Sequence, residues 1–161
     1  MQKLYVESNF SQDPETVWDV FEGDEFRAAL SDKTGLHSEV VNERDEGSVV
    51  IRQLRFKGAT ELPTVVAKAL GSKQLSYLQE NRFDRDASSL TWVVDLPKLG
   101  NRVTIQGITT IVSTPTGCKR VVDGTIEVGI PFIGGKIEKV VASRFKDSMD
   151  EAVALARTLL D

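Results

Sequence analysis

The chain has 161 residues, of which 40% are hydrophobic and 27% charged, and its formal net charge is −4 at pH 7. This length suits one domain with a core of its own, so we expect a single domain over residues 1–161. The acidic balance argues against a nucleic-acid partner, which requires a basic face. The lone cysteine, Cys118, leaves no partner for an intramolecular disulfide and no thiolate cluster for a metal.

The first residues, MQKLYVES, lack the apolar segment of a signal peptide. No stretch of the sequence approaches the roughly 18 apolar residues of a membrane span. We therefore expect a cytoplasmic protein without a membrane span.

Residues 4–10 alternate between apolar and polar side chains, which predicts a strand. Asp13-Pro14-Glu15 then predicts the start of a helix, because Asp caps free amides, Pro suits the first turn and Glu favours the positive end of the helix dipole. This helix ends near Gly23, and a second short helix ends near Gly35. Two short helices bury little surface alone, so we expect them to pack on a sheet or on another helix.

Six strand-like segments follow, with turn signals between most of them. They cover residues 38–42, 49–56, 75–83, 90–96, 103–113 and 118–128. An antiparallel meander is favoured, because no crossover helix is needed. Apolar residues also recur at helical spacing from Leu62 to Leu70, which predicts an extra short helix between the third and fourth strands of the chain.

A long amphipathic helix is predicted from about Ile133 to Leu160, with a length of roughly 40 Å at 1.5 Å per residue. Its apolar face needs one large surface, and only the strands can provide it. A curved antiparallel sheet that wraps around one helix often leaves a pocket, so the sequence predicts a container.

This order of elements resembles the START, polyketide cyclase and birch-pollen-allergen (SRPBCC) superfamily over the whole chain. Residues 13–18, DPETVW, look like its recurring entry into the first helix. Thr34-Gly35, Leu62-Pro63 and residues 130–138, IPFIGGKIE, are similar to a bacterial family of unknown function within that superfamily. The resemblance implies an α+β helix-grip fold, with about seven curved antiparallel strands around a long C-terminal helix. It also implies a deep cavity for an apolar or amphipathic molecule, but no single reaction, because members include carriers, sensors, hydrolases and cyclases.

No catalytic or metal-binding signature is present. His37 is the only histidine and has no evident partner base or nucleophile, and Cys118, at the start of a strand, is expected to be an unactivated small hydrophobe. Gly134-Gly135 lacks the rest of a phosphate-loop pattern and is expected to let the chain turn into the last helix. We therefore expect no catalytic residue, no metal and no cofactor.

Strand 75–83 predicts polar groups in the interior. Its less charged face carries Tyr77, Gln79 and Asn81, and each buried polar group needs a hydrogen-bond partner. That partner is a ligand, a trapped water or a neighbouring side chain. On the next strand Trp92 is expected to face inward, where core packing is favoured over a contact with a ligand, while the inward faces of residues 49–56 and 103–113 stay open.

The candidate ligand-binding residues share an inward position on a strand or on the last helix: Tyr77, Gln79, Asn81, Trp92, Val94, Ile105, Thr109, Val122, Ile126, Val141, Arg144, Phe145 and Ser148. Arg144 is expected either to pair with an acidic ligand group or to extend to solvent. Leu62, Val65, Val66 and Leu70 are candidate residues of a lid over the cavity entrance. A static helix packed on the sheet edge or on the last helix is the alternative.

We expect a protein that binds or carries a hydrophobic or amphipathic small molecule between the sheet and the C-terminal helix without transforming it. A cofactor-free cyclase, dehydratase or hydrolase that uses the same cavity is one alternative. A protein-interaction module is another, which a filled cavity beside an exposed apolar patch would favour. The sequence indicates neither the ligand nor the oligomeric state.

Overall fold

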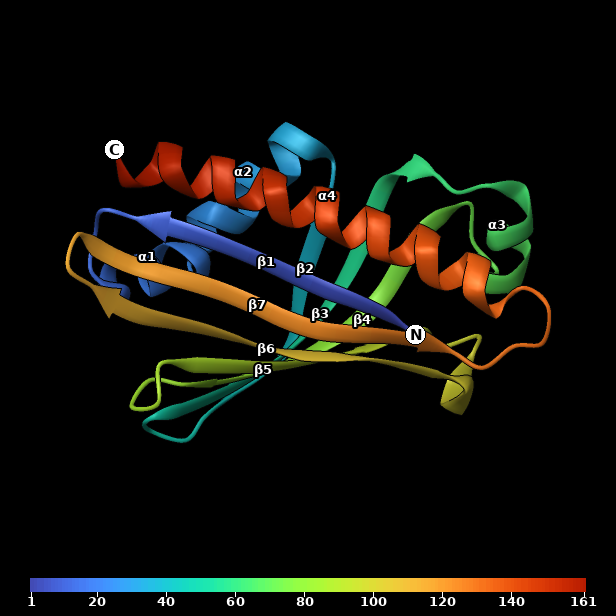
Figure 1. Ribbon diagram of the computed structural model, residues 1–161, viewed down its shortest axis with the longest axis horizontal. Coiled ribbons are helices and arrows are strands. Elements are labelled where there is room, and N and C mark those ends of the chain that lie inside the picture. Colours follow the sequence, from blue (N-terminus) through green and yellow to red (C-terminus); the bar gives the residue numbers. More distant parts are fainter.

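The computed structural model describes residues 1–161 as one seven-stranded antiparallel sheet with four α-helices and a 3-10 turn (Figure 1). The elements in chain order are β1 (Gln2–Phe10), α1 (Pro14–Phe21), α2 (Asp24–Thr34), β2 (His37–Asp45), β3 (Val49–Glu61), α3 (Thr64–Leu70), β4 (Gln74–Asp84), β5 (Ser89–Asp95), η1 (Gly100–Arg102), β6 (Val103–Thr114), β7 (Gly117–Val128) and α4 (Gly134–Leu160). The strand order is β1-β7-β6-β5-β4-β3-β2, so the first strand pairs with the last. This architecture confirms the predicted α+β helix-grip fold.

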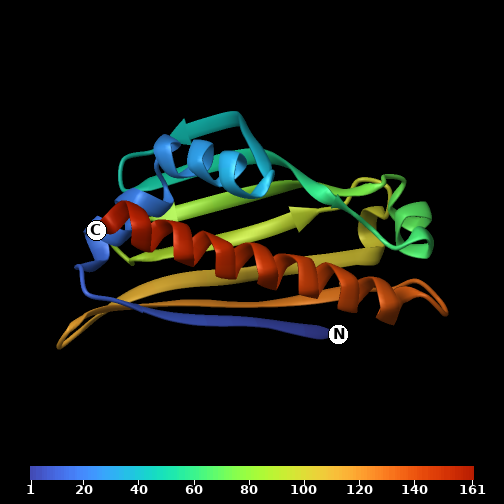
Figure 2. The same ribbon diagram turned by 90° about the horizontal axis from the view of Figure 1, so that it is seen from above.

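The curved sheet wraps around α4, which runs along its inner face (Figures 1 and 2). Helices α1 and α2 lie at the carboxyl end of α4, whereas α3 lies near its amino end. The two ends of the long helix therefore have different neighbours. No helix is both long and apolar enough to cross a membrane.

The predicted helix signals operate as expected at both short helices. Asp13 caps α1, because its carboxylate accepts a hydrogen bond of 2.8 Å from the Thr16 backbone N–H, and Pro14 occupies the first turn. Gly35 ends α2 with a φ of 76°, a conformation that strains residues with a Cβ. Both signals are local, which explains why the sequence alone identified them.

The core lies between the sheet and one face of α4. Ile137 and Val141 of α4 are fully buried, as are Ile105 of β6 and Ile126 of β7, which face each other across the two strands. Alternate residues of β6 are buried, so residues 103–113 face inward with Ile105, Thr109 and Ile111. The sequence had left this face open.

Trp92 lies flat on the inner face of the sheet over two glycines. Gly107 and Gly124 face each other on β6 and β7, and a Cβ on either would lie 2.3 or 2.5 Å from the indole ring of Trp92. Only residues without a side chain leave room for the ring at this point. The indole therefore occupies the space that two inward-facing side chains would otherwise fill.

Candidate functional site

A cavity of about 190 Å³ lies between the sheet, helices α1 and α2, and the carboxyl half of α4. Hydrophobic side chains make up 14 of its 20 lining residues, so most of its wall is apolar. Strands β3 to β7 contribute one wall. The apolar faces of α1 and α2, with Phe145, Met149 and Ala152 of α4, contribute the other.

Aromatic rings form much of this wall. Phe56 of β3 stacks on Tyr77 of β4 with ring centroids 4.9 Å apart, and Tyr77 meets Phe145 edge-on at 5.1 Å. Phe21 and Phe26 pack together at 5.2 Å on the side of the short helices. These stacked and edge-on contacts hold the rings in place around the cavity.

Several polar groups face the cavity. The Gln79 side-chain N–H donates a hydrogen bond of 2.8 Å to the Asn81 carbonyl oxygen, so these two amides partly satisfy each other. The hydroxyl groups of Tyr77, Thr109 and Ser148 line the same space and make no hydrogen bond to another side chain or to the backbone. Burial raises the pKa of Tyr77, so its hydroxyl stays protonated at neutral pH. The cavity therefore offers hydrogen-bond donors to a guest molecule.

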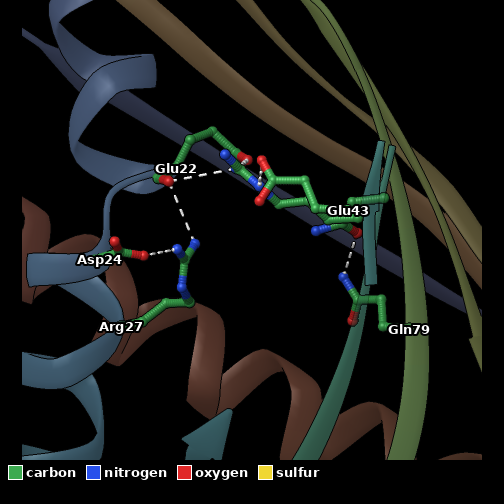
Figure 3. A network of polar contacts seen from close by, with 7 residues as sticks. Glu22, Asp24, Arg27, Glu43 and Gln79 are labelled. Atoms are coloured by element: carbon green, nitrogen blue, oxygen red, sulfur yellow. Dashed lines mark hydrogen bonds and ion pairs between the residues drawn. The ribbon is translucent and has the colours of Figure 1, made fainter. Parts of the chain in front are cut away.

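A charged network closes the cavity beside α1. The Arg52 guanidinium binds the Glu22 carboxylate at 2.8 Å and Glu43 at 3.2 Å, and Arg27 donates to the Glu22 backbone carbonyl at 3.3 Å and pairs with Asp24. Figure 3 shows this network, with Asp24 and Arg27 on one side of Glu22 and Glu43 on the other, and only Glu22 of these four lines the cavity. Burial raises the pKa of Glu22, and the neighbouring arginines oppose that shift.

The structure brings most of the predicted ligand-binding side chains to the cavity wall: Tyr77, Gln79, Asn81, Trp92, Val94, Thr109, Val122, Phe145 and Ser148. Ile105, Ile126 and Val141 lie elsewhere, in the packed core. Ile105 and Ile126 share the inward face of the sheet with the cavity residues but lie on the far side of Gly107 and Gly124 from Thr109 and Val122, and Val141 lies on α4. The alternation of side chains along a strand predicts which face of the sheet points inward. It does not predict where along that face the packed core ends and the cavity begins.

Arg144 neither lines the main cavity nor extends freely into solvent, because it is half-buried. Its guanidinium donates to the Glu61 backbone carbonyl at 2.8 Å and does not line the main cavity. It borders a second hollow of about 170 Å³, which shares Leu36, Tyr77, Phe145 and Ser148 with the main cavity. The two spaces therefore adjoin between α2, β3 and α4.

None of the four candidate lid residues lines the main cavity. Leu62 and Val66 are buried, Val65 is exposed, and Leu70 is partly buried against the core. Helix α3 lies near the amino end of α4, whereas the cavity lies beside its carboxyl half (Figure 1). This placement favours the alternative of a static helix.

The sequence analysis missed the contribution of the two short helices and of two charged residues. Trp18, Phe21, Phe26 and Leu30 were expected only to pack on the sheet or the last helix, yet they line the cavity. Glu22 carried no sequence signal. Arg120 did carry one, because it lies two residues before Val122 on the face of β7 that was assigned to the interior.

The remaining reactive side chains lie outside the cavity. His37 is exposed, with its Nδ1 atom 2.6 Å from the Ser31 hydroxyl. Burial raises the pKa of the Cys118 thiol, which disfavours the reactive thiolate. No group of three or more His, Cys, Asp or Glu side chains is arranged to hold a metal ion.

The sequence itself is similar to one protein family. The model of a family described as "Protein of unknown function (DUF2505)" matches residues 6–160. No protein with a curated description matches the sequence significantly.

Three solved structures illustrate the likeness. TTHA0849 from Thermus thermophilus has a TM-score of 0.69 at 17% identity, over 99% of this chain and 97% of that one. Ara h 8.0201 has a TM-score of 0.66 at 11% identity, over 99% and 97% of the two chains. The Zhui aromatase/cyclase from Streptomyces sp. R1128 has a TM-score of 0.64 at 9% identity, over 99% and 94%. These likenesses confirm the predicted helix-grip fold.

Proposed function

The chain belongs to the DUF2505 family of proteins of unknown function, and we propose that it binds or carries a hydrophobic or amphipathic small molecule in the cavity between the sheet, α1, α2 and α4. One observation carries the proposal: a largely apolar cavity holds hydroxyl groups that have no partner in the protein. Such a combination of apolar wall and few polar groups is typical of small-molecule sites.

The volume limits the size of the guest. An apolar cavity of about 150 Å³ suffices to bind benzene, and this cavity measures about 190 Å³. One aromatic ring with a short substituent fits that space. A longer molecule extends into the adjoining hollow beside Leu36 and Ser148.

Simple carriage is favoured over catalysis by the chemistry of the wall. The lining residues include no histidine and no cysteine, and the carboxylate of Glu22, the one acidic side chain on the wall, is bound by Arg52 at 2.8 Å. The ionisable hydroxyl that is present, that of Tyr77, is held in its protonated form by burial. A protonated phenol donates a hydrogen bond well and acts poorly as a base at neutral pH.

A blocked cavity tests the proposal. Ala152 of α4 lines the cavity, whereas Ala154 of the same helix is exposed. The neutral fluorescent probe N-phenylnaphthylamine has three aromatic rings, so it would occupy both the cavity and the adjoining hollow. It should bind the unaltered protein, lose at least about tenfold in affinity for Ala152→Phe, and bind Ala154→Phe normally. Binding that both variants retain equally would overturn the proposed site, and so would an unaltered protein that binds no apolar probe.

A second variant tests the polar contacts. Asn81→Leu removes the amide that Gln79 binds and that faces the cavity. We expect the folded variant to change the rank order of a panel of ring compounds that differ in their polar substituent. An unchanged order would exclude a role for this amide in selecting the ligand. Native mass spectrometry of freshly purified protein complements both tests, because a co-purified molecule would identify the ligand directly.

The position of the cavity entrance is inferred from the second hollow, which adjoins the main cavity. We place it at Leu36, between α2 and β3, instead of at α3. Amide hydrogen exchange should therefore slow around residues 34–37 and 58–60 when N-phenylnaphthylamine binds, while exchange in α3 stays unchanged. If hydrogen exchange slows only in α3, the entrance lies at α3 and this helix is the lid that the sequence predicted.

A further inference from the structure

Arg120 projects from β7 into the cavity. It faces Ser8 on β1 and Ile111 on β6, and the neighbours on its own face, Cys118 and Val122, are almost completely buried. Side chains alternate along a strand, so Arg120 shares their inward direction. It is the one basic residue on the cavity wall.

The guanidinium of Arg120 lies over an aromatic ring and has no anionic partner. Its central carbon is 3.9 Å from the centroid of the Phe21 ring, a cation–π contact. Its Nε atom is buried and makes no hydrogen bond, the only fully buried side-chain nitrogen or oxygen in that state. Its two terminal nitrogens also form no hydrogen bond or ion pair but are not fully buried, and the residue lines the cavity.

The nearest acid is already engaged. Glu22 also lines the cavity, and Arg52 binds its carboxylate at 2.8 Å. Arg27 pairs with Asp24, and Arg144 donates to a backbone carbonyl. Burial lowers the pKa of Arg120 to about 10, so it still carries its charge at pH 7. Glu22 is close enough to favour the charged form of Arg120 but forms no ion pair with it. A largely buried cation that no carboxylate contacts directly is costly, which makes the absence of an ion pair informative.

We propose that the guest molecule is a carboxylic acid, whose carboxylate pairs with the terminal nitrogens of Arg120 while its apolar body occupies the aromatic part of the cavity. The planar guanidinium matches a carboxylate through two parallel hydrogen bonds. The proposal rests on the function proposed above, and it specifies the chemical class of the ligand.

Glu22 further restricts the negative charge that the ligand can carry. Its carboxylate lines the same small space, so a second negative charge on the guest would be repelled. A singly charged carboxylate therefore suits the site better than a phosphate dianion. The volume of about 190 Å³ limits the body to about one aromatic ring or an aliphatic group of similar size.

Matched ligands and matched variants test this inference. Cinnamate and cinnamamide share one body and differ in charge. Calorimetric titration of the unaltered protein should show cinnamate binding about tenfold or more tightly than cinnamamide, the gain expected for a charge-assisted hydrogen bond. Arg120→Met should remove that preference and leave the affinity for cinnamamide within about twofold. Arg144→Met, which removes an equal charge beside the adjoining hollow, should keep the preference.

The possible failures separate the two proposals. Equal affinity of the unaltered protein for cinnamate and cinnamamide would overturn the role of Arg120 and leave the cavity as a binding site for neutral molecules. A preference that persists in Arg120→Met would overturn it as well. If no probe of any charge binds, both proposals fall. Arg120→Lys provides a second variant if Arg120→Met does not fold. It keeps the charge without the planar fork, so it should retain a reduced preference, and a full preference would exclude bidentate pairing.

Discussion

The two halves of the sheet–helix interface are built from the same layers but differ in packing. Beside the amino half of α4, branched aliphatic residues such as Ile105, Ile126 and Ile137 fill the interior completely. Beside its carboxyl half, aromatic rings and polar groups surround a cavity of about 190 Å³. The fold alone therefore does not produce the cavity, and the choice of side chains decides which half is hollow.

On β6 and β7, Trp92 marks the boundary between the packed core and the cavity wall, whereas on β4 and β5 the wall continues past it to Gln79 and Val94. Its indole covers the glycine pair Gly107 and Gly124. Two residues along the strands in one direction lie Ile105 and Ile126, both fully buried in the packed half. Two residues in the other direction lie Thr109 and Val122, both on the cavity wall.

The largest expected effect compares one truncation in each half of α4. Ile137→Ala should lower the free energy of unfolding by about 2–5 kcal/mol, because the packed half leaves a void that its neighbours cannot fill. Met149→Ala should cost only about 1 kcal/mol, because Met149 is partly buried and already borders open space. Urea unfolding measures both values. Equal losses would show that the two halves are packed alike.

The second-largest effect on stability is expected at the glycine pair that Trp92 covers. Gly124→Ala should cost about 1–3 kcal/mol, because the new methyl group would lie 2.5 Å from the Trp92 ring and 2.7 Å from the Gln106 carbonyl oxygen. Gly135→Ala in α4 is the matched control, since nothing lies within 4 Å of its Cβ, and it should be neutral or stabilise by up to about 1 kcal/mol. A change in tryptophan fluorescence should accompany Gly124→Ala alone. If Gly124→Ala is as neutral as Gly135→Ala, the indole does not rest on the glycine pair.

The sequence predicted the fold well because its signals are local. Helix caps, turn residues and the period of apolar side chains each act over a few residues, and together they specify a strand, two helices, six strands and a long helix. The same alternation predicted that Tyr77, Gln79 and Asn81 face inward, which the structure shows.

The limits of the cavity were not predictable in this way. Ile105 and Thr109 share one face of one strand, yet only Thr109 reaches the cavity. What separates them is the position of the Trp92 ring, which depends on packing between strands that are distant in sequence. The role of Glu22 likewise depends on Arg52, which lies thirty residues away. Contacts between residues that are distant in sequence produce no periodic pattern, so a single sequence does not predict them.

A pH-dependent effect is expected in the packed half. Hydrogen bonds from the amino terminus and then from the Val128 backbone N–H hold the pKa of Glu138 below its usual 4.5. A carboxyl whose pKa is lower in the folded state stabilises the protein above its unfolded pKa, and this contribution is lost as the pH falls through the folded value.

Glu138→Gln should therefore be less stable than the unaltered protein at pH 7, and the difference should shrink as the pH falls below about 4.5. Urea unfolding at a series of pH values between 3 and about 7 measures it. Glu127→Gln is the control, because Glu127 is exposed nearby on β7 and forms no ion pair or hydrogen bond through its side chain. A stability difference that is independent of pH would mean that the charge of Glu138 contributes nothing.

The smallest effects come from two residues that adopt left-handed backbone conformations at opposite ends of the molecule. Ser88, with a φ of 49°, lies at the cavity end, where its hydroxyl accepts a hydrogen bond of 2.8 Å from the Trp18 indole and donates one of 2.7 Å to the Ile111 carbonyl. Phe132, with a φ of 69°, lies in the loop before α4 with its ring fully exposed. Both backbones are strained, but only Ser88 has contacts that offset the strain.

Glycine at the two positions should therefore have opposite effects. Phe132→Gly relieves the strain and loses no packing, so it should raise the free energy of unfolding by about 0.5–1 kcal/mol, the remainder after the greater freedom of glycine in the unfolded chain. Ser88→Gly gives the same relief but breaks two hydrogen bonds and leaves the Trp18 indole N–H without a partner, so it should lower the stability by about 1 kcal/mol. Urea unfolding of the two variants under one set of conditions decides the matter. A Phe132→Gly variant that is less stable than the unaltered protein would show that the exposed ring makes a contact after all, and a stabilised Ser88→Gly would show that its hydrogen bonds contribute less than the strain they offset.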